Sequence, residues 1–348
     1  MRNRLPSEEW LGTEMAVFAK RLDKDYKEGA GPTSPRCSRR CQDTMKIRIG
    51  TRDSQLALAQ SQLVQVSLQN EYPDLEVEIL PFKTEGDRVL ERDLHLFGGK
   101  GVFVKEIERA LLTGDCDLAV HSLKDLPTED TPGLAVVATG QRDDAADVLI
   151  TEAGYALEDV PAGFRLGTSS LRRRALLQSM RPDVTVLSVR GNLQTRLRKL
   201  AEGQVDGLVL AAAGVVRLGL WDQTVVRIDP KQFVPAAGQG AIAIQIRAND
   251  AKMAALVSVF HDAKTHARVV AERVALAQLG GGCQTPMGVH AVLDQDGFSI
   301  FGVVGDQAGT RLLRAEIRGD YADPVKTGLL LANELMRLGA LDLMGGSV

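Results

Sequence analysis

FRLGTSSLRRRALLQ, residues 164 to 178, repeats the layout of IRIGTRDSQLALAQ, residues 47 to 60. In each segment a short apolar strand ends at Gly-Thr, a serine follows, and a helix begins. The glycine permits a tight turn, and hydroxyl side chains with free backbone N–H groups then lie at the positive end of a helix dipole. Such a turn either caps its helix or binds an anion. Two copies, each beside an arginine, favour anion binding.

The chain around each copy alternates strands with helices. Strands are predicted at 46–50, 75–80, 117–122, 134–138, 184–189 and 205–211. Helices are predicted from Ser54 to about Asn70, from about Val102 to Thr113, and after Asn192. This alternation predicts an α/β fold whose sheets are parallel in part, with helices on their faces.

The C-terminal part has a different pattern. A helix from about Thr265 to Gln278 runs into three glycines, and two strands then flank Asp296-Gly297 as a hairpin. A third strand follows at 311–319, and Asp323-Pro324 opens a last helix. We expect a small α+β domain with a three-stranded antiparallel sheet.

These patterns predict a domain organisation. Residues 1–44 carry no sustained periodicity and are expected to be disordered, and the organised part begins at Met45. The part from Met45 onward is expected to divide into two or three domains.

Composition restricts the possible functions. The chain has 348 residues, a formal net charge of −3 and a pI near 6.0, which give no global attraction to nucleic acid or anionic membranes. The four cysteines form no CxxC pair, and the longest apolar run is too short to span a bilayer. The surroundings of Cys37 and Cys41 supply no His or further Cys that could complete a metal site. We expect a soluble protein of a reducing compartment, the cytoplasm, with no membrane partner.

A basic cluster lies in the second copy of the repeat. Nine basic residues and one acid lie between Arg165 and Lys199, and Arg217 follows a further strand. Several of these arginines fall at the carboxyl ends of strands, where ligands bind in open α/β sheets. A solvated charged face is the alternative. Arginine binds carboxylate and phosphate bidentately, so the cluster indicates a polyanion. Aromatic residues make up only 4% of the chain, which disfavours nucleic acid and favours a small carboxylated or phosphorylated molecule.

The segment DLAVHSLKDLP, residues 117 to 127, carries the predicted chemistry. A buried strand delivers Ser122, Lys124 and Asp125 to its carboxyl end. Asp125 is either a turn residue in a surface pair or a carboxylate in a cationic cleft. In a cleft it would stay ionised, stabilise a cationic intermediate and transfer protons.

Other motifs are weak. His261 and His266 lie five residues apart, which does not match a zinc site on one helical face, and we expect both at the surface. No complete dinucleotide fingerprint, P-loop or GxSxG elbow occurs. Ordinary nucleotide chemistry is therefore disfavoured, and no metal is expected.

The loop LGGGCQTPMG, residues 279 to 288, places Cys283 behind three glycines. A buried inert cysteine is one interpretation. A nucleophile would need a histidine base, for which there is no local pattern. A third interpretation is a covalent tether for a bulky group, with the glycines clearing side chains from around the sulfur.

Five motifs, VHSLKDLP, GTSSLRRR, VRGNLQTRL, AAGQGA and GGCQTP, occur in this order. From Met45 onward the chain resembles the porphobilinogen deaminase (hydroxymethylbilane synthase) family. The resemblance implies a transferase that joins four porphobilinogen molecules head to tail, releases ammonia, and hydrolyses off hydroxymethylbilane for tetrapyrrole and haem synthesis. It also implies a dipyrromethane cofactor held by Cys283 through a thioether, and a monomeric enzyme. The family's fold implies two doubly wound α/β lobes like those of two-lobed periplasmic binding proteins, domain 1 (45–142 with 238–258) and domain 2 (143–237), and an α+β domain 3 (259–348) that bears the cysteine.

The family's functional positions map onto this chain. Asp125 matches the catalytic aspartate. The resemblance implies that the carboxylates of the cofactor and of the growing chain are bound by Arg52, Ser54, Lys100, Ser122, Lys124, Thr168, Ser170, Arg172, Arg173, Arg190, Asn192, Arg196 and Arg217.

Two functions of other classes remain alternatives at this point. A two-lobed protein that binds small anions would share the lobes but would need neither Cys283 nor a third domain. An RNA-binding module would share the basic cluster but would bind with strong salt dependence, and without any need for Asp125.

Overall fold

The computed structural model describes residues 45–84, 104–282, 285–295, 297–306 and 308–344. The predictions for residues 1–44, for Lys100 and for Cys283 lie outside these ranges.

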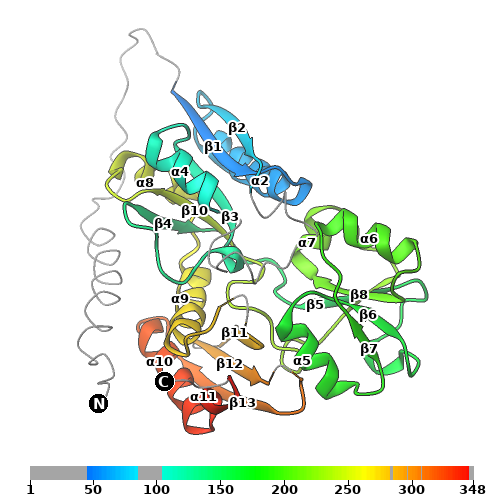
Figure 1. Cartoon of the computed structure of the whole chain (residues 1–348). Helices are drawn as coiled ribbons and strands as arrows, with labels where there is room; N and C mark the ends of the chain where they lie inside the picture. The colour runs from blue at the N-terminus through cyan, green and yellow to red at the C-terminus, as the bar shows by residue number, and fades with distance from the viewer. Residues whose placement is uncertain (1–44, 85–103, 283–284, 296, 307, 345–348) are drawn as a thin grey trace, which may run out of the picture. The chain divides into compact units, whose positions relative to one another are not determined.

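The first sheet has the strand order β2-β1-β3-β10-β4 (Figure 1). Its strands are β1 Lys46–Arg52, β2 Glu76–Phe82, β3 Leu118–Ser122, β4 Leu134–Thr139 and β10 Ile242–Arg247. β1 pairs parallel with β2 and β3, whereas β10 pairs antiparallel with β3 and β4.

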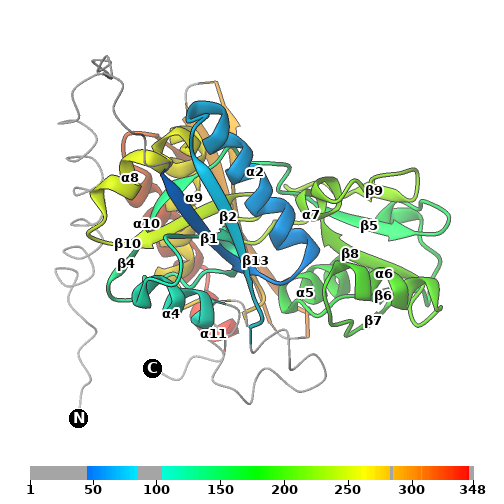
Figure 2. The same cartoon turned by 90° about the horizontal axis from the view of Figure 1, so that it is seen from above.

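Helices cover both faces of this sheet (Figures 1 and 2). Ile47 and Ile49 of β1 pack with α2 (Gln55–Glu71) and α8 (Ala251–Val257) in one apolar cluster. The other face meets α4 (Lys105–Thr113), which ends at Gly114 in the left-handed conformation.

The second sheet has the order β7-β6-β8-β5-β9. Its strands are β5 Asp147–Thr151, β6 Arg165–Gly167, β7 Thr185–Leu187, β8 Gly207–Ala211 and β9 Val225–Arg227. α5 (Leu171–Met180) contributes to the apolar cluster on one face, while α6 (Leu193–Ala201) and α7 (Ala212–Arg217) contribute to the cluster on the other.

The two sheets share one plan, which confirms the repeat. β1, α2 and β2 correspond to β6, α5 and β7, and in each unit the two strands pair parallel. In each sheet the fourth strand, β10 or β5, is antiparallel to its neighbours. The predicted α/β fold class is therefore confirmed.

One predicted reason for the repeated glycine is wrong. Neither Gly50 nor Gly167 has a positive φ, so the turn does not require glycine there. A Cβ on Gly50 would lie 2.8 Å from Cys116 Sγ, and one on Gly167 would lie 2.7 Å from Val189 Cγ2. The glycines give room for close packing against neighbouring side chains.

The third sheet is antiparallel, with the order β11-β12-β13, as predicted. Its strands are β11 Met287–Asp294, β12 Gly297–Gly305 and β13 Leu312–Gly319. α9 (Ala263–Gln278) and α10 (Pro324–Arg337) pack on it, and their alanines and leucines share its core. Asp323 caps α10 as predicted, but a short helix, α11 (Ala340–Leu343), follows.

Candidate active site

The predicted site residues lie mostly at the carboxyl ends of parallel strands. In the first sheet Arg52 ends β1 and Ser122 ends β3, and a 3-10 turn over Leu123–Asp125 follows at once. In the second sheet Thr168 follows β6, and Arg190 follows β7. Parallel pairing brings the strand ends of each sheet to one edge.

The two edges contact each other. Gln194 Nε2 in α6 donates to Gln55 Oε1 in α2 over 2.7 Å, so the first turns of these two helices meet. Both helices begin immediately after predicted site residues. The helix of the first copy of the repeat therefore meets α6, the helix that follows the second copy in the chain.

The turn Leu123–Asp125 presents the predicted catalytic residue. Leu123 is buried and its N–H donates to the Ala241 carbonyl over 3.0 Å, which continues the pairing of Ser122 with Ile242. Asp125, two residues later, is partly exposed. The fold therefore anchors the apolar end of the turn and leaves the Asp125 carboxyl accessible.

Ser122 is held by a residue that the sequence analysis missed. Gln60 of α2 is buried, and its Nε2 lies 2.9 Å from Ser122 Oγ, while that hydroxyl lies 3.2 Å from Gln60 Oε1. This pair joins α2 to the end of β3.

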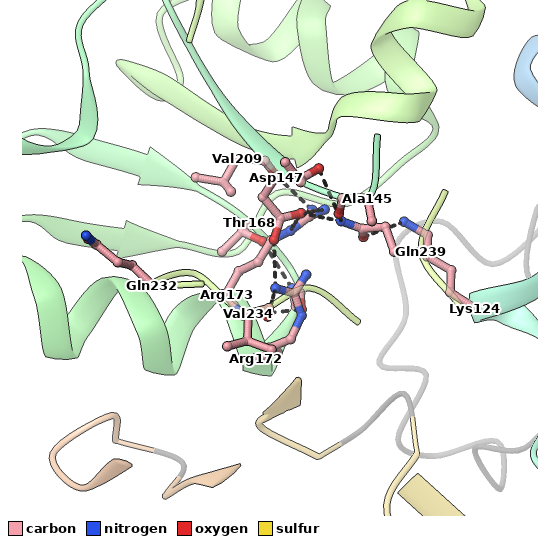
Figure 3. A network of polar contacts seen from close by, with 12 residues as sticks. Lys124, Ala145, Asp147, Thr168, Arg172, Arg173, Val209, Gln232, Val234 and Gln239 are labelled. Atoms are coloured by element: carbon pink, nitrogen blue, oxygen red, sulfur yellow. Dashed lines mark hydrogen bonds and ion pairs between the residues drawn. The ribbon is translucent and has the colours of Figure 1, made fainter. Parts of the chain in front are cut away.

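Arg172 and Arg173 share a buried carboxylate (Figure 3). Arg172 Nη1 lies 2.7 Å from Asp147 Oδ2, and Arg173 Nη2 lies 2.7 Å from Asp147 Oδ1. Asp147 is fully buried, and the two arginines are only 4% and 6% exposed. Burial alone would raise the pKa of Asp147, but the two guanidinium groups outweigh burial and hold that pKa well below its usual range.

Both arginines also donate to backbone carbonyls. Arg172 Nη1 donates to the Val234 carbonyl over 2.8 Å, and Arg173 Nη1 to the Val209 carbonyl over 2.9 Å. Arg173 thus uses Nε, Nη1 and Nη2 inside the protein. These contacts fix the guanidinium groups, and their contribution to ligand binding stays a prediction.

Gln239 links the Asp147 cluster to the turn Leu123–Asp125. Its Nε2 donates to the Ala145 carbonyl over 2.7 Å and to Asp147 Oδ1 over 2.9 Å, which leaves Oε1 to accept from Lys124 Nζ over 3.1 Å (Figure 3). Burial lowers the pKa of Lys124 to about 8, and Arg173 acts in the same direction, whereas Asp125 and Asp147 oppose both.

Arg196 belongs to the same electrostatic group. Its Nε donates to the Gly191 carbonyl over 2.8 Å, at the turn between Arg190 and Asn192. Burial and, to a smaller extent, Arg173 lower the pKa of Arg196 to about 10, while Asp125 opposes them. Arg196 of the second sheet therefore lies within electrostatic range of Asp125 of the first.

Three of the predicted ligand-binding side chains cap helices. Ser54, Ser170 and Asn192 accept the N–H groups of Ala57, Arg173 and Thr195 over 3.3, 3.4 and 2.9 Å. Thr168 Oγ1 accepts from the Ser170 N–H over 3.2 Å. The capping alternative thus accounts for one hydrogen bond at each position.

Arg217 is not at a strand end. It is the last residue of α7, its Nε lies 2.7 Å from Asp143 Oδ2, and its Nη2 donates to the Gly240 carbonyl over 2.7 Å. It therefore ties α7 to the two segments that connect the sheets.

The residues that flank Cys283 are described. α9 ends at Gln278, and Gly280, two residues later, has a φ of +67° that only glycine adopts easily. Gly282 has open space around it, and its N–H donates to Thr285 Oγ1 over 3.0 Å. The Thr285 N–H in turn donates to the Gly282 carbonyl over 3.1 Å, so these two described residues are bonded to each other.

The expectation that His261 and His266 lie at the surface is wrong. Their rings are 4.9 Å apart and both contact Thr139, so both side chains are partly buried. Burial lowers the pKa of His266 to about 4. Among the described residues, no group of three metal-ligating side chains occurs.

Asp147, Gln60 and Gln239 are the site residues that sequence reasoning missed. A signal existed for two of them: Gln239 lies inside the motif AAGQGA, and Asp147 is a charged residue that opens an apolar strand. A buried carboxylate needs a partner, so an aspartate there pointed to a buried cation.

No helix in the described ranges has the length and apolar character needed to cross a membrane.

Comparisons with known proteins bear on the whole chain. The family model "Porphobilinogen deaminase, dipyromethane cofactor binding domain" matches residues 47–255, and "Porphobilinogen deaminase, C-terminal domain" matches residues 266–337. Porphobilinogen deaminase of Syntrophobacter fumaroxidans is 45% identical over 294 residues, which cover 84% of this chain and 95% of that protein. The Roseiflexus sp. RS-1 protein of the same name is 45% identical over 298 residues, covering 86% and 98%.

A solved structure of an ancestral cationic amino acid solute-binding protein is 15% identical, with a TM-score of 0.39 over 69% of this chain and 91% of that one. That likeness carries no weight for function. The two family models and the full-length relatives decide the matter: this chain belongs to the porphobilinogen deaminase family.

Proposed function

We propose that this chain joins four porphobilinogen molecules on a dipyrromethane primer bound to Cys283, releases ammonia at each addition, and hydrolyses off hydroxymethylbilane. The observation that carries the proposal is that Lys124, beside Asp125, is joined through Gln239 to the buried cluster of Asp147 with Arg172 and Arg173 in the second sheet.

The cations of this group suit a carboxylated primer. Lys124 and Arg196 lie among other cations, and the pKa of each is lowered. A ligand carboxylate beside them would stabilise their charged forms and gain charge-assisted hydrogen bonds. The dipyrromethane group would supply a reactive pyrrole carbon as the point of chain growth. Open space at Gly282 suits attachment at the next residue.

Asp125 is the proposed catalytic residue. Its carboxylate would stabilise positive charge that develops on a pyrrole ring. It would also assist proton transfer as the protonated aminomethyl group leaves as ammonia, and would accept the proton that the ring carbon loses after the new bond forms. Lys124, Arg196 and Arg190 would hold the acidic side chains of the substrate. The N-termini of α2, α5 and α6, which Ser54, Ser170 and Asn192 cap, would direct their remaining N–H groups at further carboxylates, and the Thr168 hydroxyl lies beside the second of them.

We also propose domain limits, further ligand-binding residues, a location and an oligomeric state. They include the domain limits 45–142 with 238–258, 143–237 and 259–348, and ligand-binding roles for Arg52, Lys100, Ser122, Arg172, Arg173 and Arg217. They also include a cytoplasmic monomer without a nucleic-acid or membrane partner. The low aromatic content and the near-neutral net charge support the last of these.

Asp125→Asn tests the proposal. This nearly isosteric change removes the proton acceptor but little volume, so we expect the primer to stay attached and porphobilinogen consumption to fall by at least about a hundredfold. Intact mass reports the primer, and a colorimetric assay reports consumption.

The control is Asp206→Asn, which removes a carboxylate near the opposite end of the second sheet, where Asp206 pairs with Arg165. It should leave consumption unchanged. Near-normal turnover in Asp125→Asn would remove this residue from the chemistry.

A further inference from the structure

A further arginine, Arg273 of α9, contacts the turn that carries Asp125. We call this segment, Leu123–Asp125 with Leu126 and Pro127, the catalytic turn. Arg273 reaches the two residues that follow Asp125. Its Nη2 donates to the Pro127 carbonyl over 2.6 Å, and its Nη1 to the Leu126 carbonyl over 3.4 Å. One rigid guanidinium group thus spans two successive peptide units.

The same face of α9 also packs against the turn. Val269, one helical turn before Arg273, lies in one apolar cluster with Leu123 and Leu126. The turn is therefore flanked on both sides: Leu123 is bonded to Ala241 before Asp125, and Leu126 and Pro127 are held by α9 after it.

The environment of Arg273 favours a fixed position. Burial lowers the pKa of Arg273, and Asp130, three residues beyond Pro127, opposes that shift. The Asp130 carboxylate of the same loop therefore favours the charged form of the guanidinium group that donates to the Leu126 and Pro127 carbonyls.

From these contacts we propose that Arg273 is a positioning residue that fixes the Asp125 carboxylate through the carbonyls of Leu126 and Pro127. This inference rests on the proposed function. Its physical basis is that a displacement of about 1 Å at a reacting group can reduce turnover by about a hundredfold, even when the altered side chain is remote.

The helix that carries Arg273 gives the contact a second consequence. α9 ends at Gln278, five residues before Cys283. The backbone segment that leads to the proposed attachment point is the one that holds the catalytic turn. Arg273 would therefore fix Asp125 relative to the C-terminal end of α9, from which the chain continues to Cys283.

Arg273→Met is the test, and Arg314→Met is its matched control. Arg314 of β13 also bridges two successive carbonyls, donating Nη2 to Gln232 over 2.7 Å and Nη1 to Lys231 over 3.4 Å, but it lies away from the turn. We expect Arg273→Met to reduce kcat by about tenfold or more with little change in KM, and Arg314→Met to leave both unchanged. Both variants should carry the primer by intact mass.

Two further variants separate positioning from folding. Arg273→Lys keeps a cation that reaches one carbonyl, so it should recover part of kcat even where Arg273→Met proves unstable. Adding Arg273→Met to Asp125→Asn should change the residual rate by less than about twofold, because the group being positioned is already gone.

The outcomes distinguish the two proposals. Wild-type protein without turnover would contradict the proposed function itself. Active wild-type protein in which Arg273→Met behaves like Arg314→Met would overturn only the positioning role. A full additional loss in the Asp125→Asn background would also overturn it.

Discussion

Lys124 shows how a single residue's surroundings set its chemistry. Its ammonium group accepts no hydrogen bonds, so the Gln239 carbonyl oxygen that faces it is a matched partner. Burial and Arg173 lower its pKa to about 8, which lies near physiological pH. The charge of this residue is therefore sensitive to pH in the range where the enzyme works.

Primer uptake should follow this charge. In protein without primer, the Lys124 ammonium is present below pH 8 and is lost as pH rises through about 8, so attraction of carboxylates weakens on the alkaline side. We expect the rate of adduct formation, followed by intact mass, to fall above that pH. In Lys124→Arg the fall should disappear, because guanidinium does not titrate there. An identical alkaline fall in Lys124→Arg would assign it to another group.

Some residue roles could be predicted and others could not. The position of Lys124 and Asp125 after β3 could be predicted because a strand pattern places them at a carboxyl end, and the same kind of pattern located the caps at Ser54, Ser170 and Asn192. The partner of Arg172 and Arg173 was not found, because Asp147 is 25 residues away in the chain and only the sheet brings it close. Arg273 was missed for the same reason.

At the scale of elements, α5 is attached to its sheet by charge as well as by apolar packing. Leu176 and Leu177 are buried against the second sheet, while Arg172 and Arg173 in the first turn of α5 meet Asp147 at the start of β5. Removing one member of such a buried set leaves an uncompensated charge, which costs far more than breaking an exposed pair.

Asp147→Asn should therefore destabilise the protein by about 3 to 5 kcal/mol, measured by denaturant unfolding. Asp206→Asn breaks the half-exposed ion pair with Arg165 and should lower the free energy of unfolding by less than about 1 kcal/mol. The folded pKa of Asp147 is lowered, so its contribution is present above the unfolded pKa of about 4 and is lost as pH falls. Equal losses in the two variants would contradict a structural role for the buried charge.

Element limits show where pattern reasoning ends. Helix ends marked by glycine or capping residues, such as Gly114 and Asn192, agree with the structure. α7 was not predicted, because its alanine-rich sequence continues the apolar run of β8 without a cap. That omission placed Arg217 at a strand end, whereas it ends a helix.

At the scale of the whole molecule, one repeated unit accounts for two of the three sheets. The repeat was visible because strand, turn and helix follow one another directly in β1–α2–β2 and in β6–α5–β7. The insertion of β10 between β3 and β4 joins residues more than a hundred positions apart, and local periodicity carries no record of that pairing. The turn Leu123–Asp125 follows a strand of the first sheet and is joined through Gln239 to Asp147 of the second sheet. The third sheet begins at Met287, four residues after Cys283.

The central claim is that Cys283 carries a covalent primer, and intact mass under denaturing conditions tests it most directly. Active wild-type protein should be heavier than its polypeptide by two pyrrole units, and Cys283→Ser should have the mass of the bare chain and no turnover. An unmodified mass in active wild-type protein, or an adduct that survives in Cys283→Ser, would contradict the account.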